Sequence, residues 1–200
     1  MLCCSATGEK LKPLVIGTAA RPRAFKQNIV TPDNLPVTWK HNKMAWMTTA
    51  VFEDWLSQLN ETMKKKKGRI ILFVDNATSH VVSKKLQCSC QFLPPHLTSE
   101  LQPFDQGIIQ AMNANYRKSM LHNLLAAVGK FITATEFAKF VTVFDAIRWI
   151  GSAWHNVREE TILKCFRRAG FASPETDLQE QEDSTSESDL VKRTTRSTPV

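Results

Sequence analysis

The sequence predicts an α/β fold in which helices cover a short-stranded sheet from the C-terminal side of the chain. Apolar runs of strand length lie at 11–18, 70–74 and 90–93, and a helical pattern separates the first two. Long helical patterns then occupy much of 106–169. Strands that alternate with helices and precede a helical block are typical of this fold class.

Length and composition fit one domain with a tail. Two hundred residues that are 42% hydrophobic can bury a sizeable core. The odd count of five cysteines favours a reducing compartment. No apolar run reaches membrane-spanning length, so we expect no membrane partner. Residues 1–6 lack the features of a signal peptide and resemble the interior of a strand.

Charge divides the chain into two parts. Residues 172–200 hold seven acidic and three basic residues, a net of −4, which leaves +11 on residues 1–171 of the +7 chain. The acidic tail has almost no apolar mass, so we expect it to be disordered. A basic body favours a polyanionic partner, most simply nucleic acid, although a lysine-rich domain without such a partner has the same composition.

The first third of the chain predicts a hairpin, a loop and a helix. Two apolar runs within 1–18 flank a turn-like stretch, which indicates a hairpin. Residues 19–43 contain three prolines and no periodicity, so we expect a long loop. An amphipathic helix follows, with Thr48 or Thr49 near its first turn. Its apolar positions are Trp46, Val51, Phe52, Trp55 and Leu59.

The lysine run at 64–67 stands before Gly68, and it has two interpretations. Cations at a helix C-terminus complement the helix dipole, and glycine is a natural stop. A nuclear localisation patch has the same composition. We favour the helix end.

The rest of the chain predicts two more strands and three helices. The β-branched run at 70–74 indicates a central strand of the parallel type, and 90–93 a second strand, with a turn or short helix at 79–86 between them. A helix over 106–128 stops at Gly129. Thr133 and Glu136 have capping-box spacing, so they begin a helix whose apolar face runs from Phe137 to Trp154. A last helix covers about 158–169.

Two carboxylates are candidate metal ligands. Asp75 follows the apolar strand, and ligands in α/β sheets gather at the carboxyl ends of strands. Asp105 lies at the start of the long helix. If the two ends meet, both carboxylates can hold Mg²⁺, which prefers oxygen ligands. Taken singly, Asp75 is an ordinary turn residue and Asp105 an ordinary N-cap.

Three motifs surround these acids. They are Asp75-Asn76-Ala77-Thr78-Ser79-His80, Phe92-Leu93-Pro94-Pro95-His96-Leu97-Thr98-Ser99 and Leu101-Gln102-Pro103-Phe104-Asp105-Gln106-Gly107. Together they resemble the DDE-superfamily endonuclease domain of Tigger and other pogo-like transposases, which centromere protein B and the jerky proteins share. Segments at 7–17, 45–48, 146–154 and 165–171 are similar too, so the resemblance covers most of 1–171.

The resemblance implies a ribonuclease H-like mixed sheet and Mg²⁺-dependent cleavage and transfer of DNA strands. It matches Asp75 and Asp105 to the second and third acids of a catalytic triad. The first acid of that family lies on a central strand upstream of the hairpin, and this sequence begins after that point. Glu9 falls in the hairpin turn and Asp33 in the proline-rich loop, so neither is a credible replacement.

We therefore expect a domain that lacks its first central strand, is catalytically inactive and only marginally stable alone, and binds Mg²⁺ weakly. We expect residence in the nucleus and weak, non-specific, salt-dependent DNA binding by the +11 body. The alternative is a protein-interaction module with no DNA role. A zinc site is disfavoured because Cys88 and Cys90 are separated by one residue, whereas structural zinc sites usually have two or more.

Overall fold

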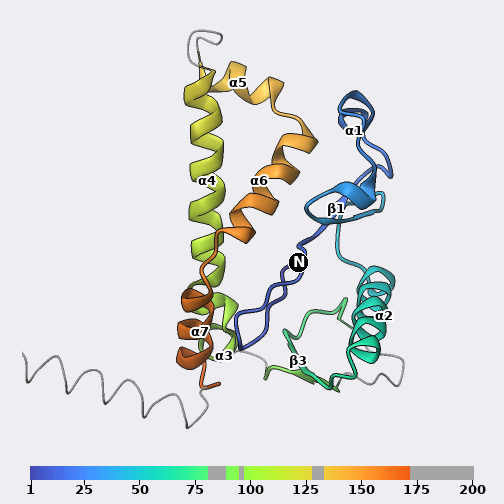
Figure 1. Ribbon diagram of the computed structural model, residues 1–200, viewed down its shortest axis with the longest axis vertical. Helices are drawn as coiled ribbons and strands as arrows, with labels where there is room; N and C mark the ends of the chain where they lie inside the picture. The colour runs from blue at the N-terminus through green and yellow to red at the C-terminus, as the bar shows by residue number, and fades with distance from the viewer. Residues whose placement is uncertain (81–88, 95–96, 128–132, 172–200) are drawn as a thin grey trace, which may run out of the picture.

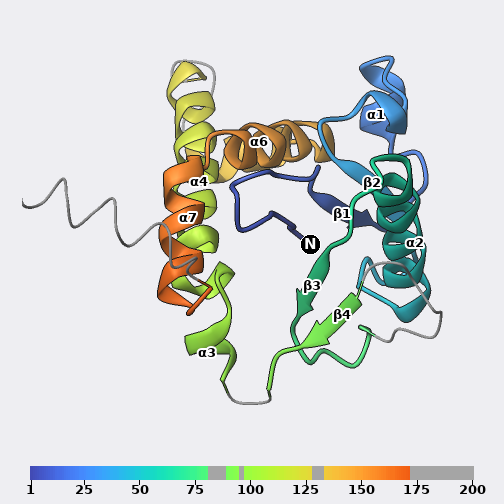
Figure 2. The same cartoon turned by 60° about the horizontal axis from the view of Figure 1, so that its bottom comes forward.

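The computed structural model describes residues 1–80, 89–94, 97–127 and 133–171. The expected disordered tail at 172–200 and the expected helix stop at Gly129 lie outside the described residues, as does most of the turn or short helix expected at 79–86. The α/β class predicted from the sequence is confirmed, with short strands and helices packed around a central hairpin (Figures 1 and 2).

The described strands form two parallel pairs. In the first, β1 (Leu14–Gly17) pairs with β2 (Thr38–His41), with Leu14 opposite Thr38. In the second, β3 (Ile71–Val74) pairs with β4 (Ser89–Phe92), with Ile71 opposite Ser89. Over the described ranges, each pair is a separate two-stranded sheet.

The parallel strand predicted at 70–74 is confirmed as β3, and its central position in a larger sheet stays a prediction. The side chains of Ile71 and Phe73 are 62% and 43% exposed, and only Val74 is buried. In the described chain β4 is its one hydrogen-bonded neighbour. One face of the apolar run is therefore partly exposed in the part of the chain that the structure describes.

The long loop expected at 19–43 is wrong as well. This stretch contains helix α1 (Arg23–Gln27), a 3₁₀ turn at Pro32–Asn34 and strand β2. The ring of Trp39 on β2 lies 5.2 Å from that of Phe25 on α1. It also covers Gly17, where a Cβ would meet the indole at 2.2 Å. A side chain at Gly17 would thus displace the indole from β1.

The expected N-terminal hairpin is present in reduced form. The strand expected at 1–6 contributes one antiparallel bridge, Cys4 to Lys10, and the Leu11 N–H donates to the Cys3 carbonyl at 3.0 Å. Because successive side chains of extended backbone point to opposite sides, the hairpin lies between two cores. Met1 and Cys3 pack on the core of helix α2 (Thr49–Lys65), while Leu2 and Cys4 pack on the core of helix α7 (Glu159–Arg168).

This position between two cores partly shields the two adjacent thiols from water. Burial raises the pKa of Cys3 to about 11 and that of Cys4 to about 12. Both thiols are therefore protonated at neutral pH, which makes them poor nucleophiles and poor metal ligands.

Helix α2 (Thr49–Lys65) confirms the amphipathic helix. The Thr48 hydroxyl caps it by accepting from the Val51 N–H at 3.4 Å. Its buried face packs on Leu14 of β1 and Val74 of β3. The apolar residues of that face are Phe52, Trp55, Leu56 and Leu59. Trp46, which the periodicity assigned to this face, precedes the helix and is 72% exposed.

The lysine run lies at the C-terminus of α2, which is the interpretation favoured from the sequence. Lys64 and Lys65 occupy the last turn, and the Gly68 N–H donates to the Met63 carbonyl at 3.0 Å. The residue with a left-handed backbone is Lys67, at φ 51°, one position before the glycine.

The C-terminal cover consists of several helices around α4 (Ile109–Ala126), which is the long upright helix in Figure 1. The others are α3 (Thr98–Leu101), the π-helical turn η2 (Phe104–Ile108), α5 (Ala134–Phe140), α6 (Val143–His155) and α7 (Glu159–Arg168). Helix α6 packs along α4, where Asn115 donates to the Ala153 carbonyl at 3.3 Å and the Tyr116 and Trp149 rings lie 6.0 Å apart.

The capping box predicted at Thr133 and Glu136 is confirmed, but the single helix expected to reach Trp154 is wrong. The chain leaves helical geometry at Val141, and a second capping box, Thr142 with Asp145, begins α6. Two satisfied N-termini replace one continuous helix, which lets α6 turn back along α4.

The hairpin is attached to the end of α6 by two side chains. Lys10 Nζ donates to the carbonyls of Trp154, His155 and Val157 at 3.1, 2.7 and 2.6 Å. The Trp154 indole N–H donates to the Leu11 carbonyl at 2.7 Å. An ammonium at a helix C-terminus satisfies carbonyls that have no partner within the helix. None of the described helices has the length and apolarity needed to span a membrane.

Candidate active site at β3 and α4

Asp75 follows β3 directly and is held by a turn. The His80 N–H donates to the Ala77 carbonyl at 2.9 Å, which folds the polar stretch back on the strand end. His80 Nδ1 then lies 2.5 Å from Asp75 Oδ1, and the imidazole stacks on Phe52 of α2 at 4.5 Å. The His80 side chain is 12% exposed and that of Asp75 42%, so a fixed imidazole orients a carboxylate that still reaches solvent.

Asp105 lies in η2, at the foot of α4, and its side chain is exposed. Its N–H donates to the Gln102 carbonyl at 3.0 Å. Two residues on, Gly107 has φ 137°, a conformation that L side chains rarely adopt, and it joins η2 to α4. Ile108 is fully buried, so the turn that carries Asp105 is anchored from beneath.

An aromatic junction connects the two places. The ring of Phe73 on β3 lies 4.6 Å from that of Phe171, which lies 5.9 Å from that of Phe166 on α7. Phe166 packs on the buried cluster that contains Ile108. The strand that ends in Asp75 and the turn that carries Asp105 are therefore attached to the same end of α7.

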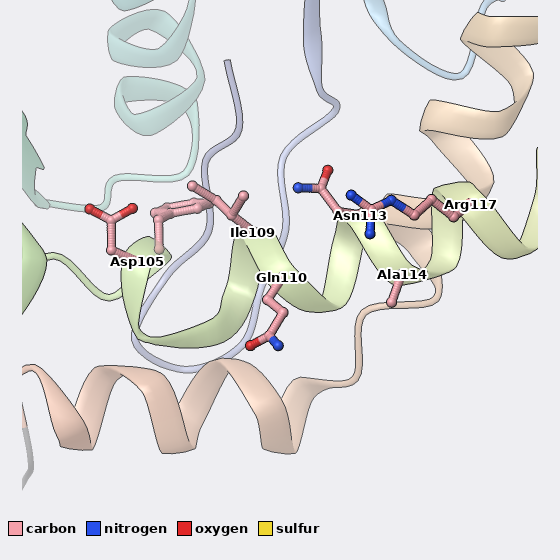
Figure 3. A pocket seen from close by; sticks show the side chains of 7 residues that line it. Asp105, Ile109, Gln110, Asn113, Ala114 and Arg117 are labelled. Atoms are coloured by element: carbon pink, nitrogen blue, oxygen red, sulfur yellow. The ribbon is translucent and has the colours of Figure 1, made fainter.

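A hollow of about 460 Å³ opens beside Asp105 along α4 (Figure 3). Its walls hold one carboxylate, one guanidinium, two amides and three apolar side chains. The lining residues are Phe104, Asp105, Ile109, Gln110, Asn113, Ala114 and Arg117. The sequence prediction included Asp105 and missed Gln110, Asn113 and Arg117, whose signal is the helical spacing of three polar residues after the acid.

The donor chemistry of the two carboxylates suits a hard cation. Mg²⁺ is commonly bound by one or two carboxylates together with waters and substrate phosphates, and both side chains reach solvent. Across the described residues, no three His, Cys, Asp or Glu gather closely enough to hold a metal ion. The metal site stays a prediction that rests on two acids.

The structure places the two acids that were rejected as replacements for the first acid, Glu9 and Asp33, in turns. Glu9 is in the hairpin turn, where its carbonyl accepts from the Ser5 N–H at 2.8 Å. Asp33 is in the 3₁₀ turn between α1 and β2. Of the two cysteines weighed for zinc, Cys88 lies outside the described residues.

The sequence matches a known protein family over most of its length. The family model described as DDE superfamily endonuclease matches residues 1–166. No solved structure matches the chain significantly.

Curated relatives carry names from two groups. Tigger transposable element-derived protein 4 of Mus musculus is 35% identical over 83% of this chain and 31% of its own length. CENP-B homolog protein 2 of Schizosaccharomyces pombe is 34% identical over 85% of this chain and 34% of its own. Major centromere autoantigen B of Homo sapiens is 30% identical over 86% and 27%. The chain thus spans about a third of the length of these relatives.

Proposed function

Because this chain belongs to the DDE superfamily endonuclease family, we propose that it is a transposase-derived nuclease domain that binds DNA in the nucleus without cutting it. The observation that carries the proposal is the position of Asp75 and Asp105. One carboxylate follows a parallel strand, the other stands at the foot of a long helix, and both supporting elements meet the end of α7.

The two parallel pairs are parts of one ribonuclease H-like sheet in the proposed fold. Support comes from β3, which exposes Ile71 and Phe73 and has one hydrogen-bonded neighbour among the described strands. Such an edge favours pairing with a further strand. We propose that this strand is the central one that carries the first acid in the family.

The residues proposed to hold Mg²⁺ are Asp75 and Asp105, and His80 positions the first of them. When bound between such carboxylates, the ion supplies a polarised water and stabilises a leaving oxygen at a phosphodiester. His80 contributes by restricting the Asp75 carboxylate through its Nδ1 contact of 2.5 Å. Hydrogen-bond partners of metal-binding side chains generally fix the ligand orientation in this way.

The net positive charge of the chain and the names of its relatives support DNA as the partner. Residues 1–171 carry a net +11, and their chemistry suits a polyanion. The relatives' names refer to centromeres and to a transposable element, both of which are chromosomal DNA. These names also support the proposed nuclear location.

The proposed absence of cleavage concerns the 200-residue chain itself. Two carboxylates match the family triad. Neither Glu9 in the hairpin turn nor Asp33 in the 3₁₀ turn follows a strand of the β3 sheet. With one ligand fewer, a metal position loses affinity, and DNA can bind without reaction.

The DNA-binding proposal predicts a steep salt dependence. The purified 200-residue chain should retain a labelled duplex at low salt, and the logarithm of its binding constant should fall linearly with the logarithm of the salt concentration, because bound cations release counterions from DNA. Fluorescence anisotropy at several NaCl concentrations measures this slope. A chain that ignores DNA yet binds a protein partner independently of salt is instead an interaction module.

The absence of cleavage predicts that supercoiled plasmid stays supercoiled when it is incubated with the chain and Mg²⁺. Agarose-gel separation of supercoiled and nicked plasmid measures the outcome, with Asp75→Ala as the matched sample. Nicking by the native sequence that disappears in Asp75→Ala would show an active nuclease and refute this part of the proposal.

A further inference from the structure

Helix α4 has an unusual charge composition for a helix with no buried side chain. Its 18 residues include Arg117, Lys118 and His122 and no acid. Exposed helices generally carry charges of both signs, so the absence of carboxylates along Ile109–Ala126 favours contact with an anion. Among the described residues that line the adjoining hollow, Asp105 is the one acid.

We propose that Gln110, Asn113 and Arg117, hereafter the α4 polar face, bind the phosphodiester backbone of DNA next to Asp105. This inference rests on the proposed DNA-binding function and assigns it to particular side chains. The three residues lie at helical spacings of three and four and all of them line the hollow. In Figure 3, Asn113 and Arg117 lie along one edge of the α4 ribbon and Gln110 points from the other edge.

The donors of the α4 polar face are available to a ligand. All three side chains are exposed, and within the described chain none of them forms a hydrogen bond or an ion pair with another residue. Asn115, two positions after Asn113, behaves differently, because its side-chain amide donates to the Ala153 carbonyl of α6. Helix α4 thus directs the amides of Gln110 and Asn113 and the guanidinium of Arg117 to solvent.

Dimensions and chemistry fit a short stretch of one strand. Gln110 and Arg117 are seven positions apart, which is about 10 Å along an α-helix. One DNA strand presents a phosphate for roughly each 3.4 Å of duplex axis, so the face spans about three phosphates. Guanidinium and amide groups are common donors to phosphate oxygens, and such contacts position a backbone without reading its sequence.

The two ends of the hollow carry charges of opposite sign. Arg117 stands at one end of the hollow and the carboxylate of Asp105 at the other (Figure 3). A phosphate is attracted to the Arg117 end and repelled from the Asp105 end unless a cation lies between them. The α4 polar face therefore holds backbone beside the metal-binding acid and leaves the position at Asp105 for a cation.

Arg117→Gln tests the inference in the full chain. Losing one phosphate contact should lower the slope of the salt dependence by about 0.9 for duplex DNA and weaken binding roughly fivefold to tenfold at ~0.1 M salt. The matched control is Lys26→Gln, which removes the same charge from an exposed position on α1, across the molecule from α4 (Figure 1). Anisotropy titrations of a labelled duplex at several salt concentrations measure both variants.

A double variant that changes no charge, Gln110→Ala with Asn113→Ala, distinguishes the contribution of amide hydrogen bonds to DNA binding from that of charge. It should weaken binding at every salt concentration and leave the slope unchanged, because amides release no counterions. Thermal melts should match the native chain for both α4 variants, since the altered side chains are exposed.

Each outcome decides one of the two proposals. If Arg117→Gln lowers the slope and Lys26→Gln does not, the α4 polar face binds backbone. If the native chain binds DNA and the two variants behave alike, the assignment to α4 is wrong and DNA binding by the body stands. If the native chain does not bind the duplex at any salt concentration, both proposals are wrong.

Discussion

Trp154→Ala is expected to lower the free energy of unfolding by about 3–5 kcal/mol, the range observed when a large buried aromatic side chain is removed. Trp154 is 3% exposed and packs in the cluster of η2, α4 and α7. Its ring stacks on Phe104 with centroids 6.2 Å apart, and its N–H satisfies the Leu11 carbonyl. The substitution removes core volume, an aromatic pair and the attachment of the hairpin together.

Urea unfolding followed by far-ultraviolet circular dichroism measures this loss. The control is Trp46→Ala, which removes the same side chain from a position that is 72% exposed and should change stability by less than about 0.5 kcal/mol. Since domains are typically stable by about 5–15 kcal/mol, Trp154→Ala should be partly unfolded at moderate temperature. Equal effects of the two substitutions would contradict the packing described for α6.

Gly107→Val is expected to destabilise the chain by about 2–6 kcal/mol and to displace Asp105. At φ 137° a non-glycine residue costs about 1–3 kcal/mol in backbone strain. A Cβ at this position would lie 3.4 Å from Cys165 Sγ, and the further methyl groups of valine would overpack the cluster by about 1–3 kcal/mol more. The turn that carries Asp105 must then move away from α7.

Gly68→Val is the matched control for this substitution. Gly68 ends α2, its φ is not positive, and the nearest atom to an added Cβ is Met63 Sδ at 3.9 Å. Thermal melts of the two variants measure stability, and Mn²⁺ titration followed by electron paramagnetic resonance reports the metal site. If the Gly107→Val and Gly68→Val chains have the same melting temperature, η2 tolerates a side chain at position 107 and the claim that this turn is strained is wrong.

Local signals predicted the elements that depend on near neighbours in the chain. Thr48 caps α2, and Thr133 with Glu136 begins α5, where the hydrogen bonds join residues three apart. The strands predicted at 70–74 and 90–93 correspond to β3 and β4, the first from an apolar run and the second from a short stretch that ends at two prolines. For the two caps the pattern and the stabilising contact lie within the same few residues.

Elements stabilised by distant contacts escaped prediction. Strand β2 pairs with β1 and depends on Trp39 over Gly17, which no periodicity within 38–41 indicates. The break between α5 and α6 was missed because Val141, Val143 and Phe144 continue the apolar spacing across it. The second capping box at Thr142 was the available signal.

The candidate site shows the same division. Asp75 and Asp105 could be chosen from sequence because each follows a recognisable element, and the structure places both near solvent. The α4 polar face could not be chosen in this way, because the apolar residues of 109–126 gave the impression of a buried stripe. In the structure that helix buries no side chain, and Leu121 and Leu125 are 51% and 68% exposed.

The attachment of the hairpin to α6 also sets the order in which the chain can fold. Lys10 and Trp154 are 144 residues apart, so the ends of this contact leave the ribosome on the order of ten seconds apart. Until α6 emerges, the apolar sides of the hairpin lack one of their two cores. Contacts of such long sequence separation slow folding, so the nascent N-terminus is expected to depend on chaperone protection until synthesis is nearly complete.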